Sequence, residues 1–448
     1  MKVVKFGGSS LSNRRQFQKV KQIIESDDER AVIVVSALGK SNVTDDKLTD
    51  LLYVIHASIE HHMDWAPLWH VFCSRFLEIR ETLSIDFPME SFLEEIYQTF
   101  CTTKVSKDFI VSRGEYLTAQ LMAAYLGATF IDAKELIYFD YTGAIDFEKT
   151  EQAVQPFLKE EKIVVPGFYG VNPMGKEKLM TRGGSDITGA ILARSMHAAV
   201  YENWTDVSGL MMADPRIVEN PQVIEEISFR ELRELSYMGA TVLHEAAILP
   251  VQEVDIPIHI LNTNEPQARG TRISKEEIPK KTGITGIAGR KDFLSITLFK
   301  RHMSEEIGFI WKAMSIFAKH GVSIEHIPSG IDNIGVIVAK EAIEEVLFLI
   351  TEELKESLGV EEISIVEDLA LIAVVGSSMD DSIGISGRVL PILNALSIRT
   401  SILSQGAQGL NLIIGVANHE YEEVIEGIYQ GVVVTDVSNI QKRVTSNT

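Results

Sequence analysis

Short apolar runs alternate with segments of helical periodicity along residues 1–262. The runs at 2–6 and 31–38 flank a stretch from Ser12 to Ser26 in which apolar residues recur at helical spacing. Because uninterrupted apolar runs are typical of buried strands and the connection is short, the pattern predicts a parallel β-α-β unit. The later segments of this kind are predicted strands at 128–132, 162–168, 198–206 and 256–262, and predicted helices at 113–126, 186–197 and 228–240.

Residues 45–101 interrupt this alternation with a long stretch of helical periodicity, rich in Leu, Phe, Ile, Trp and Glu. We expect a helical excursion from the sheet. Four histidines fall within it, at His56, His61, His62 and His70. They have no further ligands in register, so ordinary surface or core histidines are favoured over zinc, and no metal site is expected.

The chain after residue 262 shows a different order of predicted elements. A polar stretch with glycine and proline, residues 263–285, is predicted to be a linker or an exposed edge. The order strand, helix, strand, strand, helix, strand then occurs twice, which predicts two ferredoxin-like modules at 293–365 and 369–445, with exchange of a strand between them left open. We therefore expect an α/β chain with domains at 1–275 and 283–448.

Composition narrows the classes of partner. The formal net charge is −21 at pH 7 and the pI is about 5.0, so phosphate backbones would be repelled and nucleic acid is not an expected partner. No apolar run reaches the length of a membrane span and the start lacks a signal-peptide pattern, so we expect a cytoplasmic protein without a membrane partner. Cys73 and Cys101 lack metal-binding spacing and are expected to be reduced thiols.

A glycine pair follows the first predicted strand, in the segment KFGGSS that starts at Lys5. Gly7 and Gly8 would let backbone N–H groups approach an anion closely, and Lys5 adds a mobile positive charge. The segment is not a Walker loop, because G-x-x-x-x-G-K-[ST] is absent. Taken alone, a glycine pair after a strand is more often a tight turn.

A second glycine turn, RGGSD, precedes the predicted helix at 186–197. Its Arg182 suits bidentate recognition of a carboxylate, whereas Asp186 is open to the simpler interpretation of a helix cap. Glu115, predicted to lie in the first turn of a helix, either stabilises the helix dipole or faces a substrate ammonium group. Arg216, in the loop WTDVSGLMMADPR, either reaches nucleotide phosphates or forms a surface ion pair.

Six motifs, KFGGSS, VSRGE, VPGFYG, RGGSD, WTDVSGL-x-x-ADPR and SYMGATVLH, occur in the order seen in aspartate kinases of the amino acid kinase family, and the chain resembles that family over its whole length. The resemblance implies an N-terminal amino acid kinase fold, a three-layer αβα sandwich, followed by two ferredoxin-like (βαββαβ) ACT modules. It implies an enzyme that uses ATP and Mg²⁺ to phosphorylate the side-chain carboxylate of L-aspartate, the first step towards lysine, threonine and methionine. The length implies a monofunctional kinase.

The resemblance also implies roles for matching residues. Lys5 would stabilise charge on the transferring γ-phosphoryl group, and Asp186 would organise this apparatus. Glu115 would take the substrate ammonium group and Arg182 a carboxylate. The implied lining of the aspartate pocket is Ser36, Thr44, Glu115, Phe168, Arg182 and Ser185. The implied ATP contacts are Lys5, Phe6, Gly7, Gly8, Gly183, Gly184, Thr205, Asp206, Met211, Arg216, Thr241 and Val242.

Two of the implied ATP contacts depart from the family pattern, and Met180-Thr181 stands where the family usually has Leu-Gly before RGGSD. Met211 stands where the family usually has tyrosine, and Thr241 stands where it usually has lysine. Loss of a stacking ring and of a cation is expected to weaken ATP binding or to move those contacts to other groups. Because Lys5 and Asp186 match the pattern, catalysis is still expected.

The C-terminal region resembles that of lysine-inhibited aspartate kinases. The residues implied to bind an effector at an ACT dimer interface are Met303, Gly308, Phe309, Ser323, Ile324 and Glu325. Glu325 stands where the family often has aspartate, and the simpler alternative is that these residues only pack two modules together. Lysine is the first expected effector and threonine the second, in a homodimer formed through the ACT modules.

Two other functions stay open at this point. The departures at Met211 and Thr241 suit an amino-acid-sensing regulatory protein with a weakened kinase site. The second alternative is a kinase of the same fold that acts on glutamate or N-acetylglutamate. The ammonium partner Glu115 and the two ACT modules argue against it.

Overall fold

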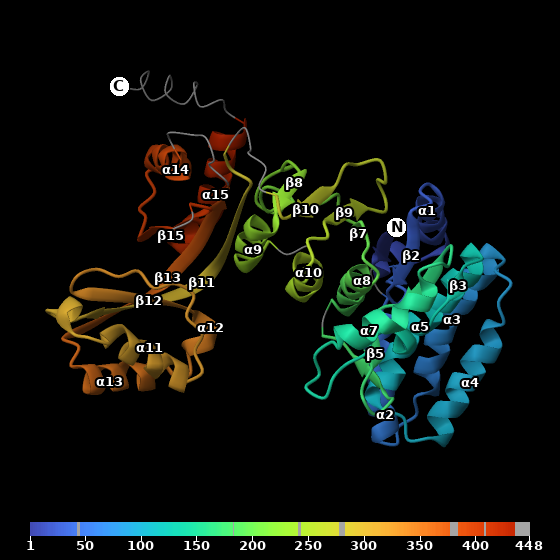
Figure 1. Ribbon diagram of the computed structural model, residues 1–448. Coiled ribbons are helices and arrows are strands. Elements are labelled where there is room, and N and C mark those ends of the chain that lie inside the picture. The colour runs from blue at the N-terminus through green and yellow to red at the C-terminus, as the bar shows by residue number, and fades with distance from the viewer. Residues whose placement is uncertain are drawn as a thin grey trace. The chain divides into compact units, whose positions relative to one another are not determined.

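The computed structural model describes residues 1–42, 45–181, 183–240, 243–276, 283–376, 384–406 and 409–434. The chain forms two compact units, coloured along the chain in Figure 1. The first unit consists of residues Met1–Leu210, Val223–Phe229 and Thr241–Glu277, and the second of Met211–Gln222, Arg230–Ala240 and Ile278–Thr448. Two short segments that lie before residue 275, 211–222 and 230–240, therefore pack with the second unit.

The first unit is built on an eight-stranded sheet of order β3-β4-β2-β1-β7-β9-β10-β8. Its strands are β1 (Lys2–Phe6), β2 (Arg30–Val35), β3 (Thr129–Phe130), β4 (Ile163–Pro166), β7 (Val200–Thr205), β8 (Glu226–Ser228), β9 (Ile258–Asn262) and β10 (Thr271–Ser274). The strands from β3 to β9 in this order are parallel, so their carboxyl ends lie along one edge. A separate hairpin joins β5 (Tyr169–Val171) and β6 (Glu177–Leu179).

Helices cover both faces of this sheet, which gives three layers (Figure 1). The helices packed into one core with Phe6 and Trp204 are α1 (Arg14–Glu25), α2 (Leu48–Glu60), α3 (Ala66–Leu83), α4 (Met89–Thr102) and α5 (Lys107–Leu126). On the other face lie α7 (Phe147–Val154), α8 (Gly184–Ser195) and α10 (Glu245–Gln252). The short elements are α6 (Ala133–Leu136), η1 (Gly8–Leu11) and η2 (Gln155–Phe157).

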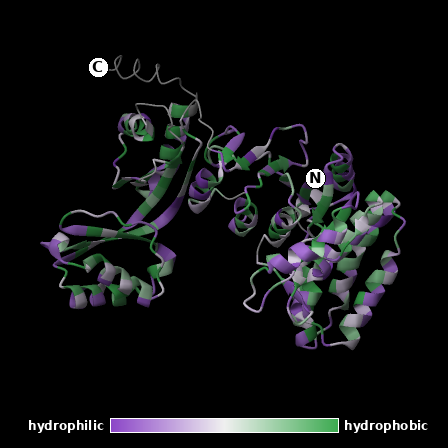
Figure 2. Cartoon of the chain, viewed as in Figure 1, coloured by the Kyte–Doolittle hydropathy of each residue, from purple (hydrophilic) through white to green (hydrophobic). Residues whose placement is uncertain are grey.

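The helical excursion predicted at 45–101 is present as α2, α3 and α4. Each of these helices turns apolar residues inward, so hydrophobic and hydrophilic positions alternate along them (Figure 2). The predicted helix at 113–126 begins earlier, at Lys107, where Ser106 caps it by accepting a hydrogen bond from the Phe109 N–H. The prediction of a linker at 263–285 was wrong in part. Strand β10 lies within this segment and pairs with β9 on one side and β8 on the other.

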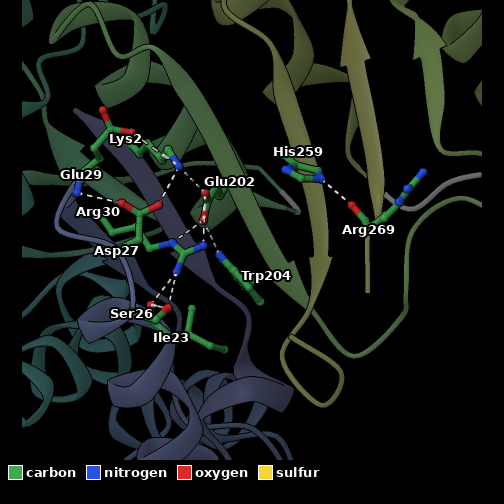
Figure 3. A network of polar contacts seen from close by, with 10 residues as sticks. All are labelled: Lys2, Ile23, Ser26, Asp27, Glu29, Arg30, Glu202, Trp204, His259 and Arg269. Carbon is green, nitrogen blue, oxygen red and sulfur yellow. Dashed lines mark hydrogen bonds and ion pairs between the residues drawn. The ribbon is translucent and has the colours of Figure 1, made fainter. Parts of the chain in front are cut away.

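A network of ion pairs holds the amino ends of β1 and β2 to β7 (Figure 3). Glu202 on β7 is buried and accepts hydrogen bonds from the Arg30 Nε and the Trp204 Nε1, both at 2.8 Å. The Lys2 Nζ lies 3.6 Å from the other oxygen of Glu202 and 2.7 Å from Asp27. This network stabilises the sheet at the edge opposite the carboxyl ends of the strands.

The second unit contains a five-stranded antiparallel sheet of order β12-β11-β13-β15-β14. Its strands are β11 (Gly286–Phe299), β12 (Asn333–Ala339), β13 (Glu362–Val375), β14 (Ile402–Gln405) and β15 (Asn411–Val416). Its helices are α9 (Phe229–Tyr237), whose first residue belongs to the first unit, α11 (Phe309–Lys319), α12 (Lys340–Ile343), α13 (Leu347–Leu358), α14 (Gly384–Ala395) and α15 (Tyr421–Tyr429), with the short turns η3 (Met303–Glu305), η4 (Asn418–Glu420) and η5 (Gln430–Val434).

Strands β11 and β13 run through both modules of this sheet. Residues 293–299 of β11 lie between β12 and the first half of β13, whereas residues 286–290 pair with 371–375, next to β15. The β11 segment 286–290, which precedes the expected first module, thus lies in the sheet beside strands of the expected second module. β13 is a single continuous strand that crosses the expected boundary between the modules at 365–369.

Candidate functional site

The candidate site of the first unit lies at the carboxyl ends of β1 and β2, where two glycine loops meet. The Gly39 N–H donates a hydrogen bond of 2.9 Å to the Gly8 carbonyl. A Cβ atom on Gly39 would lie 2.2 Å from that oxygen, and one on Gly8 would lie 3.0 Å from the Ala37 carbonyl. Only glycine allows this approach, so the pair after β1 is more than an ordinary turn.

Lys5 and Asp186 form a buried ion pair beside these loops. The Lys5 Nζ lies 2.6 Å from the Asp186 Oδ1. The side chain of Asn203 on β7 contacts both groups: its Nδ2 donates to the Asp186 Oδ1 at 3.0 Å, and its Oδ1 lies 3.5 Å from the Lys5 Nζ. Strand β1 and helix α8 therefore bring together the two residues expected to be catalytic.

The glycines before α8 serve close packing. Gly183 precedes the helix with φ of 76°, and a Cβ on it would lie 2.6 Å from the His244 side chain. Gly184 approaches the ring of Phe168, and Ser185 touches Gly167 at the end of β4. Asp186 lies in the first turn of α8 but makes no cap hydrogen bond, so the interpretation of Asp186 as a cap is wrong.

Glu115 projects from the middle of α5 and not from its first turn, as the sequence had predicted, so the helix-dipole interpretation is also wrong. Its side chain is buried and accepts a hydrogen bond from the backbone N–H of Ala37, in the loop after β2. Its Oε2 has no hydrogen-bond partner. Burial raises the pKa of this carboxyl to about 8, against an ordinary value of 4.5.

Phe168 follows β4 in a left-handed conformation, with φ of 78°. For a residue with a Cβ this conformation costs about 1–2 kcal/mol. The Phe168 N–H donates to the Thr188 Oγ1 of α8 at 2.9 Å, and its carbonyl accepts from Met180 at 2.8 Å. These bonds hold the strained residue between β4 and α8. The half-buried Ser36 follows β2 at the same edge, where its N–H donates to the Phe6 carbonyl.

The other expected nucleotide contacts are dispersed. Thr205 ends β7, where its hydroxyl donates to the exposed Asp206 at 3.2 Å. Met211 and Arg216 belong to the second unit, and Arg216 pairs there with Asp214 at 2.6 Å with its side chain 87% exposed. Four expected site residues lie outside the described residues, namely Thr44, Arg182, Thr241 and Val242.

The residues expected to bind an effector lie around the start of α11 and before β12. Met303 and Phe309 are buried in the core of the first module, and Ile324 packs against that core. Gly308 and Ser323 are exposed. The buried members therefore pack within the first module, whereas the simpler alternative had them pack two modules together.

Glu325 differs from its neighbours because its carboxylate meets α9. It accepts a hydrogen bond from the Tyr237 hydroxyl, and its Oε2 lies 3.7 Å from the Arg290 Nη1. Burial and the contact with Glu325 raise the pKa of Tyr237 to about 12. One expected effector residue thus contacts the last residue of α9, within the second unit.

Sequence reasoning missed Asn203 and Tyr201. Tyr201 packs against Gly189 of α8, and its hydroxyl donates to the Asp186 carbonyl at 3.0 Å. A pattern was present in the sequence: Asn203 is a polar residue within an apolar strand, and alternation places it on the same face as Tyr201 and opposite to Glu202 and Trp204.

Known proteins resemble the chain over nearly its whole length. The model of the amino acid kinase family matches residues 1–262. Aspartokinase 3 of Bacillus subtilis is 34% identical over 96% of this chain and 98% of its own.

Solved structures of aspartate kinases also resemble the chain over nearly its whole length. An aspartate kinase of Clostridium acetobutylicum has a TM-score of 0.88 and 42% identity, over 96% of this chain and 99% of that one. Aspartokinase III of Escherichia coli has a TM-score of 0.70 and 25% identity in complex with aspartate and ADP, over 96% of this chain and 99% of that one. In complex with lysine and aspartate its TM-score is 0.71 at 26% identity, over 97% and 99%.

These similarities confirm the expected fold class and the expected family. No helix among the described residues is long and apolar enough to cross a membrane. The chain belongs to the amino acid kinase family, as an aspartate kinase with C-terminal regulatory domains.

Proposed function

We propose that this aspartate kinase transfers the γ-phosphoryl group of ATP to the side-chain carboxylate of L-aspartate, giving 4-phospho-L-aspartate. The observation that carries the proposal is the buried Lys5–Asp186 pair at the carboxyl edge of the sheet, beside two glycine loops. The Escherichia coli relative, solved with aspartate and ADP, supports the same pair of ligands. We place the reaction in the domain over 1–275 and its regulation in 283–448.

The loop after β1 suits the phosphates. Gly7 and Gly8 present backbone without side chains, and a Cβ on Gly7 would lie 3.3 Å from the Lys5 Nζ, in the space beside the ammonium group. Lys5 would stabilise the charge on the transferring group, and Asp186 would hold the Lys5 side chain in place. Thr205, Asp206 and the glycines before α8 would complete the nucleotide contacts in the first unit.

Aspartate would enter beside Glu115. Its α-ammonium group would donate to the unpartnered Glu115 Oε2, while Ser36, Phe168 and Ser185 shape the pocket. The attacking carboxylate is already ionised at neutral pH, so the reaction needs no strong general base. Catalysis then depends on positioning and on neutralising charge.

Mg²⁺ fits this site as a companion of the nucleotide. The described residues contain no group of three His, Cys, Asp or Glu side chains that would hold a metal ion alone. Mg²⁺ commonly uses one or two carboxylates together with substrate phosphates, and the exposed Asp206, which follows β7 at this edge, would hold the ion, because Asp186 is paired with Lys5. When bound, the ion would neutralise phosphate charge.

Feedback control is the finer part of the proposal. The product is expected to supply lysine, threonine and methionine synthesis in the cytoplasm. We propose lysine as the first effector and threonine as the second, supported by the Escherichia coli relative solved with lysine. An effector ammonium group would compete with Tyr237 and Arg290 for the Glu325 carboxylate.

Dimerisation through the ACT modules completes the proposal. Helices α11 and α13 of the first module expose Trp311 (72%) and Phe348 (73%), and Ile307, just before α11, is 96% exposed. Apolar side chains gathered on one face of a module suit a protein interface. The exposed side chains belong to the module that carries the expected effector residues.

The test is aspartyl phosphate formation from ATP and L-aspartate, trapped with hydroxylamine. We expect turnover by the wild-type protein and a loss of about 1,000-fold or more in Lys5→Ala, because the transferring group loses its cation. The matched control is Lys2→Ala at the other end of the same strand, which should keep kcat. Glutamate and N-acetylglutamate serve as competing substrates.

Two outcomes would overturn the proposal. Absence of turnover with folded wild-type protein at millimolar ATP would favour the amino-acid-sensing alternative, in line with Met211 and Thr241. Higher activity on glutamate or N-acetylglutamate than on aspartate would favour the kinase acting on another acid.

A further inference from the structure

We infer that Asn203 is a positioning residue for phosphoryl transfer, which holds Lys5 and Asp186 in their productive arrangement. The inference rests on the proposed function. Asn203 belongs to no part of the site that the sequence motifs defined, because it precedes the motif residues Thr205 and Asp206 on β7.

The side chains of Lys5, Asp186 and Asn203 contact one another. Lys5 on β1 and Asn203 on β7 are directly paired across two parallel strands, and Asp186 reaches them from α8. The amide contacts both groups: its Nδ2 donates to the Asp186 Oδ1 at 3.0 Å, and its Oδ1 accepts a hydrogen bond from the Lys5 Nζ at 3.5 Å. An amide is the side chain that offers a donor and an acceptor together without a charge.

The chemistry explains why a neutral residue suits this position. Lys5 needs a free positive charge directed at the transferring phosphoryl group, while Asp186 must stay ionised to hold it. A second carboxylate at Asn203 would compete for Lys5 and repel Asp186. An apolar residue would leave the partly buried Asp186 Oδ1 with fewer donors and allow its side chain to rotate. The amide restrains both groups and leaves the net charge of the pair unchanged.

Few other polar groups lie near the Asn203 side chain among the described residues. The residue paired with Asn203 on β9 is the apolar Ile260, and Tyr201 on the same face of β7 donates its hydroxyl to the Asp186 backbone carbonyl. Asn203 itself is 4% exposed. Lys5, Asp186 and the Tyr201 hydroxyl are therefore the polar groups that face its side chain among the described contacts.

The test compares kcat and both KM values in Asn203→Leu, Asn203→Asp and the control Glu202→Gln. Leucine keeps the size of the side chain and removes both polar ends, so we expect kcat to fall about 10- to 100-fold while each KM changes less than about threefold. The neighbouring Glu202 faces the opposite side of the sheet in the ion-pair network of Figure 3, so its variant should lower the melting temperature without lowering kcat.

Asn203→Asp provides a readout that a merely structural role would not move. A protonated carboxyl has the donor and acceptor pattern of the amide, whereas the ionised form repels Asp186. The ratio of variant to wild-type kcat should therefore decrease as pH rises, with Lys5, Asp186 and Tyr201 as the facing groups. If Asn203→Leu does not fold, the pH dependence of the kcat ratio for Asn203→Asp is the test of the positioning role.

Equal kcat in folded Asn203→Leu and wild type, or a pH-independent ratio for Asn203→Asp, would overturn the inference. So would a loss of kcat in Glu202→Gln as large as in Asn203→Leu. The ¹³Cε chemical shift of Lys5, assigned by its absence in Lys5→Ala, needs no turnover and should change in Asn203→Leu only. A changed shift in a wild-type protein without turnover would support the positioning role and reject the proposed function.

Discussion

Glu115 shows at the scale of one residue how burial prepares a group for a charged substrate. Its carboxyl accepts one backbone N–H and leaves the Oε2 without a partner. Burial disfavours the ionised form and raises the pKa of Glu115 to about 8. An ammonium group arriving beside it would reverse that balance and ionise the carboxyl.

Binding of aspartate should therefore release a proton below pH 8. We expect the KM for aspartate to rise as pH falls from 8 to 6, by at most about tenfold per pH unit, because the free carboxyl must first ionise. In Glu115→Gln the KM should be higher and nearly constant over this interval. Initial-rate measurements with saturating ATP check this, and a flat profile in the wild type would contradict it.

The stability of the protein should also depend on pH through the ionisation of Glu115. A carboxyl whose folded pKa of about 8 exceeds its unfolded value near 4.5 binds more protons when folded, so the stability it contributes is full below pH 4.5 and is lost as pH rises through 8. Relative to wild type, Glu115→Gln should gain thermal stability at pH 8.5 compared with pH 5. Melting curves at both values test this; an equal difference at both would show that Glu115 does not titrate in this range.

At the scale of elements, the loops after β1 and β2 depend on contact between their backbones. Gly39→Ala would place a methyl group 2.2 Å from the Gly8 carbonyl and push the phosphate loop aside. We expect kcat/KM for ATP to fall about 100-fold with the fold retained, because small misplacements in a site have effects of that size.

The matched control for this variant is Gly175→Ala in the β5–β6 turn. Gly175 has φ of 75° and open space around it, so alanine there costs about 1 kcal/mol of strain and should leave kcat/KM unchanged. Circular dichroism and steady-state kinetics on both variants make the comparison. Equal kinetic losses would mean that general destabilisation, and not the loop contact, explains the effect.

Helix α9 contacts the expected effector residue Glu325 through its last residue, Tyr237. The Tyr237 hydroxyl would compete with an effector ammonium group for Glu325. Tyr237→Phe should therefore lower the lysine concentration for half-inhibition about 10- to 100-fold, the effect of one hydrogen bond to a charged group. Inhibition curves measure this, with unchanged uninhibited kcat as the control. An unchanged half-inhibition concentration would show that Tyr237 does not compete.

At the scale of the whole molecule, oligomeric state is the property that one chain leaves open. If the exposed face of α11 and α13 is the dimer interface, Trp311→Lys should produce a monomer. Size-exclusion chromatography with light scattering checks this. Tyr141→Lys, at an equally exposed aromatic residue of the first unit, is the control and should stay dimeric. A dimer in both variants would place the interface elsewhere.

The sequence by itself determined the order and type of most elements. Strands β1, β2, β4, β7 and β9 lie where the sequence predicted strands, and the apolar runs within β2 and β4 reflect burial on both faces of the sheet. The glycine motifs and their order were sufficient to indicate the kinase family. Both are properties of local composition and spacing, which a chain carries without its fold.

Local patterns also had limits. The start of α5 at Lys107 was missed, because Ser106 provides a cap without a change in periodicity. Strand β10 was missed, because its polar surroundings resemble a loop while its backbone finds partners on both sides. In both cases a long-range contact or a single cap outweighed composition.

The tertiary structure alone decided which residues meet. The pairing of β1 with β7 placed Asn203 beside Lys5, although 198 positions separate them. Burial of Glu115 against Ala37, and the sharing of β11 and β13 between two modules, likewise depend on packing. Periodicity assigns a residue to a face of its own element, but only the arrangement of elements brings two such faces together.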